Sequence, residues 1–359
     1  MLAETLTQLA NVPAAFKRAY STVYYVTEGG DWVIERVGMH LARGLRALDV
    51  PHRVVRSADG LRRQVIHFGS RNAYLSGAHE RVHPSNRVVF TWFHGSDEDP
   101  HPDNQRMIRL LPQVAPRVAR IVTAANVSKE RLLHWGVPEE KIALIPLGVD
   151  LRYFRPAAAE ARRALRRRFG VPDGAVCIGS FQKDGNGWGE GLEPKRIKGP
   201  DILLETLTRL AKRYPIFVLL TGPARGYVKR GLEAAGIPYH HDFLRRAEEV
   251  VSYYQCLDLY LVTSRDEGGP ESLLECLATA VPMVSTRVGM SLDVIRDGEN
   301  GQLADVEDID GLTRAAASFI DDALFAQRCA NVGLVTVQAY DWAAIARRYH
   351  TWVYRELLA

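Results

Sequence analysis

Two carboxylates in the second half of the chain are spaced to hold a polyhydroxyl ligand. Glu267 precedes the turn Gly268-Gly269-Pro270, and Glu275 lies eight positions after Glu267, within an apolar run. The apolar residues of this run recur at helical spacing, which predicts a buried helix with Pro270 in its first turn. Glycines allow backbone amides to approach a ligand, and the start of a helix favours anions such as phosphate. The segment therefore predicts a clamp for a nucleotide sugar, in which Glu275 accepts hydrogen bonds from sugar hydroxyls.

The same segment resembles a known family signature. The pattern Glu267-Gly-Gly-Pro-Glu-Ser-Leu-Leu-Glu275 is similar to the Glu-x7-Glu motif of the retaining GT-B glycosyltransferases of family 4. The resemblance extends to other parts of the chain, which are residues 142–150, 281–289 and 294–303, with Phe154 and Pro156. These matches lie between residues 142 and 303, and their order and spacing carry the resemblance.

The resemblance implies roles for the acidic pair and for the turn between them. Glu267 is expected to act in catalysis by holding hydroxyls of the donor sugar, and Glu275 is expected to hold the ribose. Backbone amides near Gly268, Gly269 and Pro270 are expected to line the donor site. Members of the family retain the anomeric configuration, so an acceptor hydroxyl is expected to attack on the face from which the diphosphate leaves. No residue stands out as a covalent nucleophile, which agrees with this expectation.

Cations for the departing diphosphate are expected in the long polar loop after the first strand of the second half. Lys198, which precedes a glycine, matches the lysine of the family pattern, and a fixed cation stabilises charge that develops on a leaving phosphate. The arginine of the pattern has no direct match. Lys183 stands nearest the strand end, while Lys195 and Arg196 compete for the same role. Lysine lacks the bidentate fork of arginine, so the pattern is altered here, and these side chains could also be solvated loop residues.

Other positions match the family outside these two loops. His94 ends a predicted strand where the family carries an active-site histidine that contacts the donor sugar, although a lone strand-end histidine can be structural. Gly29 and Gly30 match first-loop glycines that approach the phosphates. Gly222 follows a buried strand near the expected nucleotide, although it could be a turn glycine only. Acceptor recognition is expected in loops of the first half, which carry no motif that identifies the acceptor.

Two short acidic patterns raise the question of a metal site. Asp97 and Asp99, followed by His101, and the pair Asp308 and Asp310 have the Asp-x-Asp spacing that metal-dependent transferases of another fold use. Short acidic pairs are common by chance, and Asp308 stands where a carboxylate can cap a helix. We therefore expect no metal and no cofactor, with the nucleotide-diphosphate sugar as donor substrate.

Strands and helices alternate twice along the chain, which predicts an α/β protein with two Rossmann-like, doubly wound domains. Strands are expected at residues 22–26, 64–68, 87–93, 120–124, 141–145, 176–180, 217–220, 257–262 and 282–285, and helices at 32–45, 128–135 (capped by Ser128) and 201–213. The expected domains are residues 1–165 on the acceptor side and 170–339 on the donor side, with a final helix at 340–359 that packs back on the first domain. In the GT-B architecture the two domains face each other across a cleft, where ligands bind at the carboxyl ends of the strands.

Composition and charge limit the class of protein. The chain has 359 residues, of which 47% are hydrophobic and 25% charged, as in a globular protein with two ordinary domains. No apolar window approaches the length of a membrane span, and the amino terminus lacks a signal-peptide pattern. The four cysteines lack metal-like spacing, which favours buried reduced thiols in the cytoplasm.

Basic residues are concentrated although the net charge is only +4. Five arginines lie between residues 162 and 168, and Arg62 and Arg63 add to the basic surface. This pattern is typical of a solvated helix, and it also fits attraction to an anionic membrane face or an acidic glycan. No nucleic-acid motif accompanies the arginines. We therefore expect a cytoplasmic protein, with peripheral association at the inner membrane face as an open alternative.

Two other classes of function compete with glycosyl transfer. The first is another enzyme on the same fold, such as a nucleotide-sugar epimerase, which would need no acceptor, or a phosphorylase, which would carry pyridoxal phosphate. The second is a non-catalytic nucleotide-sugar binding protein. The presence of both glutamates, Lys198 and His94 favours the transferase. Sugar, base, acceptor, linkage and oligomeric state are not identified by the sequence.

Overall fold

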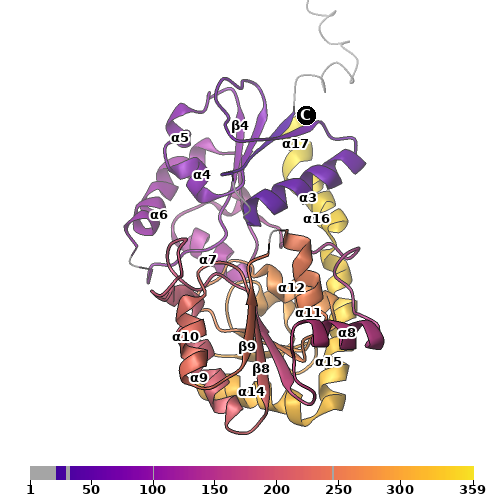
Figure 1. The fold of residues 1–359 in the computed structure, drawn as a ribbon. Coiled ribbons are helices and arrows are strands. Elements are labelled where there is room, and N and C mark those ends of the chain that lie inside the picture. The colour runs from indigo at the N-terminus through magenta and orange to yellow at the C-terminus, as the bar shows by residue number, and fades with distance from the viewer. Residues whose placement is uncertain (1–21, 30–32, 100, 245) are drawn as a thin grey trace, which may run out of the picture. The chain divides into compact units, whose positions relative to one another are not determined.

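The computed structural model describes residues 22–29, 33–99, 101–244 and 246–359. These residues form two compact units that divide between Leu147 and Gly148. The second unit ends at Asp341, and the chain then returns to the first unit with Trp342–Ala359 (Figure 1). Each unit has its own sheet and its own hydrophobic core.

The first unit is built on a parallel sheet with the strand order β2-β1-β3-β4-β5-β6. Its strands are β1 (Val23–Val26), β2 (His52–Val55), β3 (Val65–Phe68), β4 (Arg87–Thr91), β5 (Arg120–Thr123) and β6 (Ile142–Leu144). The side chains of β3 are all buried, as are those of β4 after Arg87. A parallel sheet with both faces covered requires such continuous apolar strands.

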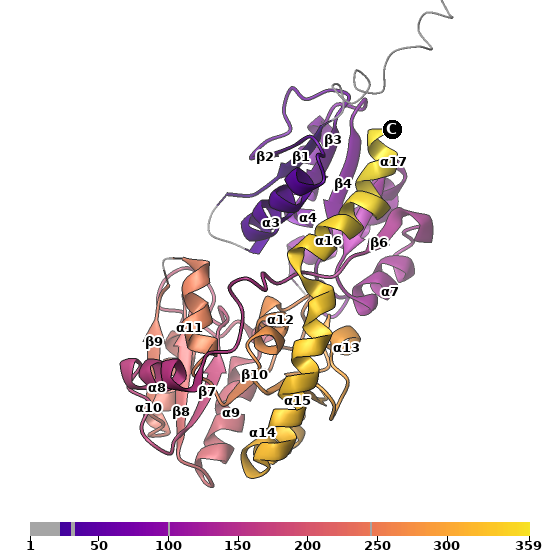
Figure 2. The same ribbon diagram turned by 90° about the vertical axis from the view of Figure 1, so that its right-hand side faces the viewer.

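Helices from both ends of the chain cover this sheet. They are α3 (Val33–Ala47), α4 (Arg71–Leu75), α5 (Ala78–Arg81), α6 (Pro102–Val114), α7 (Asn126–His134), α16 (Trp342–Tyr349) and α17 (Arg355–Leu358), the last two joined by a π-helical turn at His350–Tyr354. Helix α16 lies beside α3 (Figures 1 and 2). The two helices approach closely because Gly44 faces Ala346, and His40 stacks on Trp342 with ring centroids 5.1 Å apart.

The second unit also contains a parallel sheet, in the order β12-β11-β10-β7-β8-β9. Its strands are β7 (Val176–Ser180), β8 (Ile216–Thr221), β9 (Tyr239–Asp242), β10 (Leu259–Val262), β11 (Met283–Thr286) and β12 (Gln302–Ala304). From β7 the chain builds outward to β9, crosses back to β10 and continues to the other edge. This is the strand order of the dinucleotide-binding Rossmann fold, with the reversal between β7 and β10.

Helices α9, α10 and α14 share one hydrophobic core with this sheet. The helices of the second unit are α8 (Ala159–Arg168), α9 (Pro200–Ala211), α10 (Gly226–Ala234), α11 (Val250–Tyr254), α12 (Glu271–Ala278), α13 (Ser291–Val294), α14 (Ile309–Asp321) and α15 (Ala323–Thr336). Leu203 and Leu207, four residues apart on α9, lie in the core with Val218, Leu232 and Leu312. The helical spacing of these apolar residues explains which face of α9 is buried.

The predicted alternation of strands and helices is present, and both sheets are parallel. Three strands were not predicted, namely β2, β9 and β12. All three lie at edges of their sheets, and none has the continuous buried pattern of the central strands. An edge strand buries less of each side chain, so its sequence carries a weaker apolar signal. The cysteines are buried free thiols, as expected.

Two sequence-based expectations differ from the structure. Ser128 does not cap a helix: α7 begins at Asn126, and the buried Ser128 hydroxyl donates to the Phe93 carbonyl at 3.1 Å. The expected first domain ended at residue 165, whereas the second unit begins at Gly148 and includes α8. Helix α8 belongs there because two of its arginines, Arg162 and Arg166, pair with Asp258 in the second unit. No helix within the described ranges has both the length and the apolar character to span a bilayer.

A buried ion pair fixes the long loop between β7 and α9. Arg225 Nε lies 3.0 Å from Asp184 Oδ1, and both side chains are fully buried. Arg225 also donates to the carbonyls of Ser180 at 2.6 Å and Thr221 at 2.9 Å, which are the last residues of β7 and β8. Burial raises the pKa of the Asp184 carboxyl, and the charge of Arg225 opposes this rise. One guanidinium therefore joins two strand ends to the start of the loop.

A buried histidine attaches the carboxyl-terminal segment to the first sheet. The ring nitrogens of His67, in β3, lie 2.5 Å from the Tyr354 hydroxyl and 2.9 Å from the Thr91 hydroxyl. Burial lowers the pKa of His67 to about 3. The ring is therefore neutral near pH 7 and can donate one hydrogen bond and accept the other.

We expect the His67 contact to make the first unit sensitive to mild acid. The folded-state pKa is below the unfolded value of about 6.5, so as pH falls from about 6.5 toward 3 only the unfolded chain binds this proton. The free energy of unfolding should fall by up to about 1.4 kcal/mol per pH unit from this residue. Urea unfolding of H67Q between pH 7 and 5 should show a smaller loss of stability than the wild type, whereas H134Q, at an exposed histidine of the first unit, should not.

We expect the R225M variant to be strongly destabilised because it leaves the Asp184 carboxylate buried without its partner. Removing one member of a buried pair costs roughly 3–5 kcal/mol. The double variant R225M/D184L removes both charges and should recover part of this loss in urea unfolding. A double variant as unstable as R225M would show that the carbonyl contacts of Arg225, and not the charge pair, dominate.

Candidate active site

The loops after β7 and β10 meet where the strand order of the second sheet reverses. Ligands of open α/β sheets bind outside the carboxyl ends of the strands at this switch point. Lys198 lies in the loop after β7, in the short 3-10 turn Arg196–Lys198 that precedes α9. Glu267 lies in the loop between β10 and α12. The topology therefore brings together two site residues that are far apart in the sequence.

Lys198 and Glu267 form an ion pair with 2.5 Å between Nζ and Oε1. The side chains are 23% and 9% exposed, respectively. The Ser264 hydroxyl donates to the same Oε1 at 2.9 Å, so both contacts use one oxygen of the carboxylate. Opposite charges interact more strongly when they are partly removed from water. The pair therefore holds a cation and a carboxylate together at the sheet edge.

The backbone beside Lys198 is packed directly against Thr263, the first residue after β10. Gly199 has a φ of +59°, and a Cβ there would lie 1.9 Å from the Thr263 carbonyl oxygen. The Thr263 hydroxyl donates to the Gly199 carbonyl at 3.0 Å, and Gln182 Nε2 donates to the Lys198 carbonyl at 3.0 Å. Only glycine fits this left-handed position against a neighbouring carbonyl. The close approach sets where the Lys198 side chain begins.

The turn after Glu267 is packed equally closely. Gly289 has a φ of +48°, and a Cβ there would lie 2.4 Å from the Glu267 carbonyl oxygen. The amide of Met290 donates to the Gly268 carbonyl at 3.2 Å. Helix α12 then begins at Glu271, with Pro270 as its N-cap residue and no hydrogen bond from a capping side chain. The first amides of α12 therefore start beside the Gly268-Gly269 turn, where the helix dipole favours an anion.

Glu275 lies one turn into α12 and is held by a tyrosine from α11. The Tyr254 hydroxyl donates to Glu275 Oε2 at 2.7 Å. The Tyr254 ring packs on Phe181, with centroids 4.8 Å apart, and Phe181 is the first residue after β7. Glu275 therefore lies near the carboxyl end of β7, close to the loop that carries the candidate cations.

The three candidates for the arginine of the family pattern lie in different surroundings. Lys183 Nζ lies 4.1 Å from the centroid of the Trp188 ring. Lys195 is half-buried, and Arg196 is exposed, with its carbonyl accepting a hydrogen bond from Arg265 at 2.7 Å. The charge of Lys183 is thus placed over an aromatic face, which stabilises a cation.

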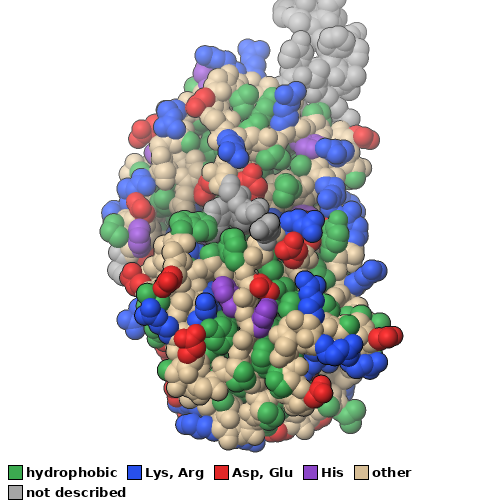
Figure 3. All heavy atoms as spheres, viewed as in Figure 1, with side chains coloured by type: hydrophobic (Ala, Val, Ile, Leu, Met, Phe, Trp, Pro, Cys, Tyr) green, Lys and Arg blue, Asp and Glu red, His purple; other side chains and the backbone are tan. Residues whose placement is uncertain are grey.

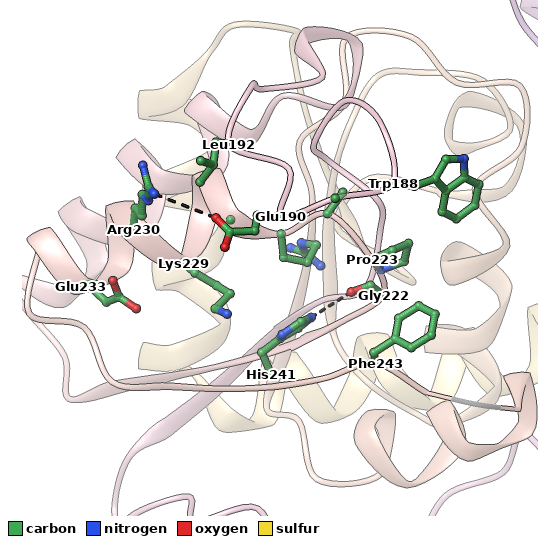
Figure 4. Close-up of a pocket in the computed structure, with 14 residues that line it drawn as sticks. Trp188, Glu190, Leu192, Gly222, Pro223, Lys229, Arg230, Glu233, His241 and Phe243 are labelled. Atoms are coloured by element: carbon green, nitrogen blue, oxygen red, sulfur yellow. Dashed lines mark hydrogen bonds and ion pairs between the residues drawn. The ribbon is translucent and has the colours of Figure 1, made fainter.

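A pocket of about 510 Å³ lies at the carboxyl ends of β8 and β9. Trp188, Pro223 and Phe243 are grouped on one side of it, and on the other side lie Glu190, Lys229, Arg230 and Glu233 (Figure 4). Between them, His241 Nε2 lies 2.8 Å from the carbonyl oxygen of Gly222. Trp188 and Phe243 are 64% and 66% exposed, so flat aromatic faces are available for stacking on a ligand.

Three predicted site residues belong to the first unit, and two of them lie within the described residues. Gly29 follows β1 with a φ of +76°, near the Arg56 guanidinium, and the exposed His94 follows β4. Both lie at the carboxyl edge of the first sheet, whose strand order reverses between β1 and β3. Gly30 lies outside the described residues. The second unit brings together Lys198, Glu267, Gly268, Gly269, Pro270 and Glu275, with Lys183 and Gly222 in neighbouring loops.

The acidic patterns considered for a metal make other contacts. The Asp97 carboxylate accepts from Trp135 Nε1 at 2.9 and 3.0 Å, and Asp99 Oδ1 accepts from the His101 amide at 3.0 Å. Asp308 caps α14 as expected, accepting a backbone amide at 2.7 Å. In the part of the chain that the structure describes, no cluster of three histidine, cysteine or acidic side chains could hold a metal ion.

Three residues that hold the site were missed by the sequence analysis. Ser264 could have been found as a serine two positions after a buried strand and three positions before Glu267. Gly289 lies inside a segment that resembles the family, but its role depends on a contact with the turn after Glu267. Tyr254 carries no local signal, because its contact with Glu275 joins two different helices.

Family models match both halves of the chain. The model described as Glycosyltransferase Family 4 matches residues 12–153, and the model described as Glycosyl transferases group 1 matches residues 192–334. The D-inositol 3-phosphate glycosyltransferase of Corynebacterium urealyticum is 31% identical over 51% of this chain and 43% of its own length. The enzyme of the same name from Geodermatophilus obscurus is 30% identical over 55% of this chain and 44% of its own. The chain thus spans less than half the length of these two relatives.

Solved structures share the architecture of more than nine-tenths of the chain. Anabaena HepE, in complex with UDP and glucose, aligns with a TM-score of 0.73 and 18% identity over 92% of this chain and 98% of its own. A sucrose-phosphate synthase from Thermosynechococcus elongatus aligns with a TM-score of 0.75 and 16% identity over 94% of this chain and 98% of its own. With two parallel, doubly wound sheets and matching family models on both, the chain belongs to the family 4 glycosyltransferases and has the GT-B fold.

Proposed function

We propose that the chain is a retaining, metal-independent glycosyltransferase that moves a sugar from a nucleotide-diphosphate sugar to an acceptor hydroxyl. The Lys198–Glu267 pair at the switch point of the second sheet carries this proposal. A cation suits the diphosphate, and a carboxylate suits sugar hydroxyls as a hydrogen-bond acceptor. The start of α12 adds backbone amides beside the pair. One edge of the sheet therefore offers a cation and backbone amides for the diphosphate, and a carboxylate for the sugar hydroxyls.

The donor would lie along the carboxyl edge of the second sheet. From β10 through β7 and β8 to β9 there are three strand intervals, which is about 14 Å at the usual strand spacing. The sugar would bind Glu267, and the diphosphate would lie between Lys198 and the start of α12. The ribose would bind Glu275, and the base would lie toward Trp188 and Phe243 in the pocket beyond β8.

The proposed reaction needs charge stabilisation more than a nucleophilic side chain. The acceptor oxygen forms a bond to the anomeric carbon on the face from which the diphosphate oxygen departs, and the hydroxyl proton passes to the departing diphosphate. Lys198 and the amides near Gly268 and Gly269 stabilise the developing phosphate charge without reorganisation, because the fold already holds them in place. For His94, Gly29 and Gly30 in the first unit, the support is the family motif. For Lys183 as substitute for the arginine, the support is its position just after β7.

The relatives supply the first compounds to test. Anabaena HepE binds UDP and glucose, and the names of the curated relatives include D-inositol 3-phosphate. We therefore propose UDP-sugars as the first donors, and an inositol phosphate as the first acceptor.

We also propose peripheral association with an anionic membrane face, in a cytoplasmic protein. Of the arginines on α8, Arg162 and Arg166 pair with Asp258, whereas Arg163 and Arg167 are exposed. Lys and Arg side chains gather on the surface over α8 (Figure 3). Each basic residue near an anionic surface contributes roughly 1 kcal/mol of attraction.

We expect E275A to bind nucleoside diphosphates about tenfold or more weakly than the wild type. The variant removes an acceptor for ribose hydroxyls, and a hydrogen bond to a charged group is worth roughly 1.5–3 kcal/mol. A thermal-shift screen of UDP, GDP, ADP and dTDP first identifies the base, and calorimetry then gives the affinity. E205A, which removes an exposed carboxylate on α9, is the control and should bind normally.

Binding and turnover each test the proposal. A wild-type protein that no nucleoside diphosphate stabilises, or an E275A variant with unchanged affinity, would contradict it. In turnover, EDTA should leave transfer from the selected donor sugar intact, and NMR of the product should show retained anomeric configuration. Loss of turnover with EDTA would overturn metal independence, and inversion would overturn the front-face reaction.

We expect R163Q/R167Q to bind anionic vesicles at least tenfold more weakly than the wild type. Removing two basic residues withdraws roughly 2 kcal/mol of attraction. Flotation with vesicles of phosphatidylcholine, alone or mixed with phosphatidylglycerol, measures this binding. The control R314Q/R328Q makes the same charge change at exposed positions of α14 and α15. Equal loss in both variants would indicate net charge rather than an α8 surface, and no wild-type binding would refute the proposal.

A further inference from the structure

Glu275 is held by a buried tyrosine that lies outside the family motif. Tyr254 is the last residue of α11, and its hydroxyl donates to Glu275 Oε2 at 2.7 Å. Helices α11 and α12 are neighbours in the second unit (Figure 1). The contact therefore joins the second glutamate of the motif to a separate helix.

The tyrosine ring is fixed on several sides. Tyr254 is 1% exposed. Its ring centroid lies 4.8 Å from that of Phe181, 5.5 Å from that of Tyr260 and 6.1 Å from that of Phe154. Close packing holds the ring in one position, so its hydroxyl is a donor at a fixed place for the Glu275 carboxylate.

The hydroxyl is also fixed in its protonation state. Burial raises the pKa of Tyr254 well above its ordinary value, and the neighbouring Glu275 charge raises it further. The phenol therefore keeps its proton near neutral pH and donates to the carboxylate. The acceptor is Oε2 of the Glu275 carboxylate.

We propose that Tyr254 is a positioning residue, which fixes Oε2 of Glu275 and so sets the orientation in which the carboxylate meets the ribose hydroxyls of the donor. The inference rests on the proposed function, since it assigns the ribose to Glu275. A glutamate side chain loses rotamer freedom when it binds a ligand. Tyr254 removes part of that freedom before the donor arrives, and preorganisation of this kind increases affinity.

The test compares ribose with 2′-deoxyribose. Affinities for UDP and 2′-deoxy-UDP, with GDP and 2′-deoxy-GDP in parallel, are measured by calorimetry for the wild type, Y254F and E275A. We expect Y254F to bind the ribonucleotide about tenfold more weakly and to lose most of the preference for ribose. We also expect Y254F/E275A to match E275A, because Tyr254 acts through Glu275 and their effects should not add.

A neighbouring tyrosine provides the matched control. Tyr253 is buried in the same helix, and its hydroxyl also donates to a carboxylate, that of Asp242. Y253F therefore makes the same chemical change one residue away and should keep the ribose preference. If Y254F does not fold, Y254M, which keeps an apolar side chain in the cluster, takes its place.

The outcomes separate this inference from the proposed function. If E275A loses the ribose preference and Y254F keeps it, Tyr254 is not a positioning residue. If E275A keeps the preference, or the wild type binds none of these nucleotides, the assignment of Glu275 fails and the inference fails with it. Equal loss in Y253F and Y254F would show a general effect of the aromatic cluster, and would also overturn the inference.

Discussion

The ion pair between Lys198 and Glu267 is the interaction on which the candidate site of the second unit depends. It joins the loops after β7 and β10, the two strands between which the sheet reverses its order. An ion pair that is largely buried needs further hydrogen bonds and fixed geometry to be stable. Ser264 supplies one such bond to Glu267, and Gln182 holds the backbone at Lys198.

Close backbone packing gives this pair its geometry. Gly199 lies against the Thr263 carbonyl, and Gly289 lies against the Glu267 carbonyl, so neither position has room for a side chain. The two glycines bring three loops within contact distance at one edge of the sheet. The chemistry of the site thus depends on residues that have no functional groups of their own.

Buried polar side chains connect distant segments within each unit. The buried pair of Arg225 and Asp184 fixes the start of the long loop after β7, although burying two charges is costly. In the first unit, neutral His67 joins the sheet to the carboxyl-terminal segment through Tyr354. Both arrangements use a buried polar group to connect segments that are distant in sequence, where an apolar contact would be less directional.

The sequence by itself determined the class of fold, the central strands and the family. Parallel strands buried on both faces leave continuous apolar runs, and the Glu-x7-Glu motif is local, so both can be recognised without coordinates. Edge strands β2, β9 and β12 were not predicted because most of their side chains are exposed or only partly buried. The boundary of the second unit was placed too late because Arg162 and Arg166 find their partner, Asp258, about a hundred residues further along the chain.

Only the tertiary structure decided how the motif residues are held. It pairs Lys198 with Glu267, sets Lys183 over Trp188, and gives Glu275 a tyrosine from another helix. Each of these contacts depends on which strand ends are adjacent, and strand order is set by packing of the whole sheet. A local pattern specifies residue types and spacing along the chain, whereas a binding site requires distances between segments, which only the folded sheet provides.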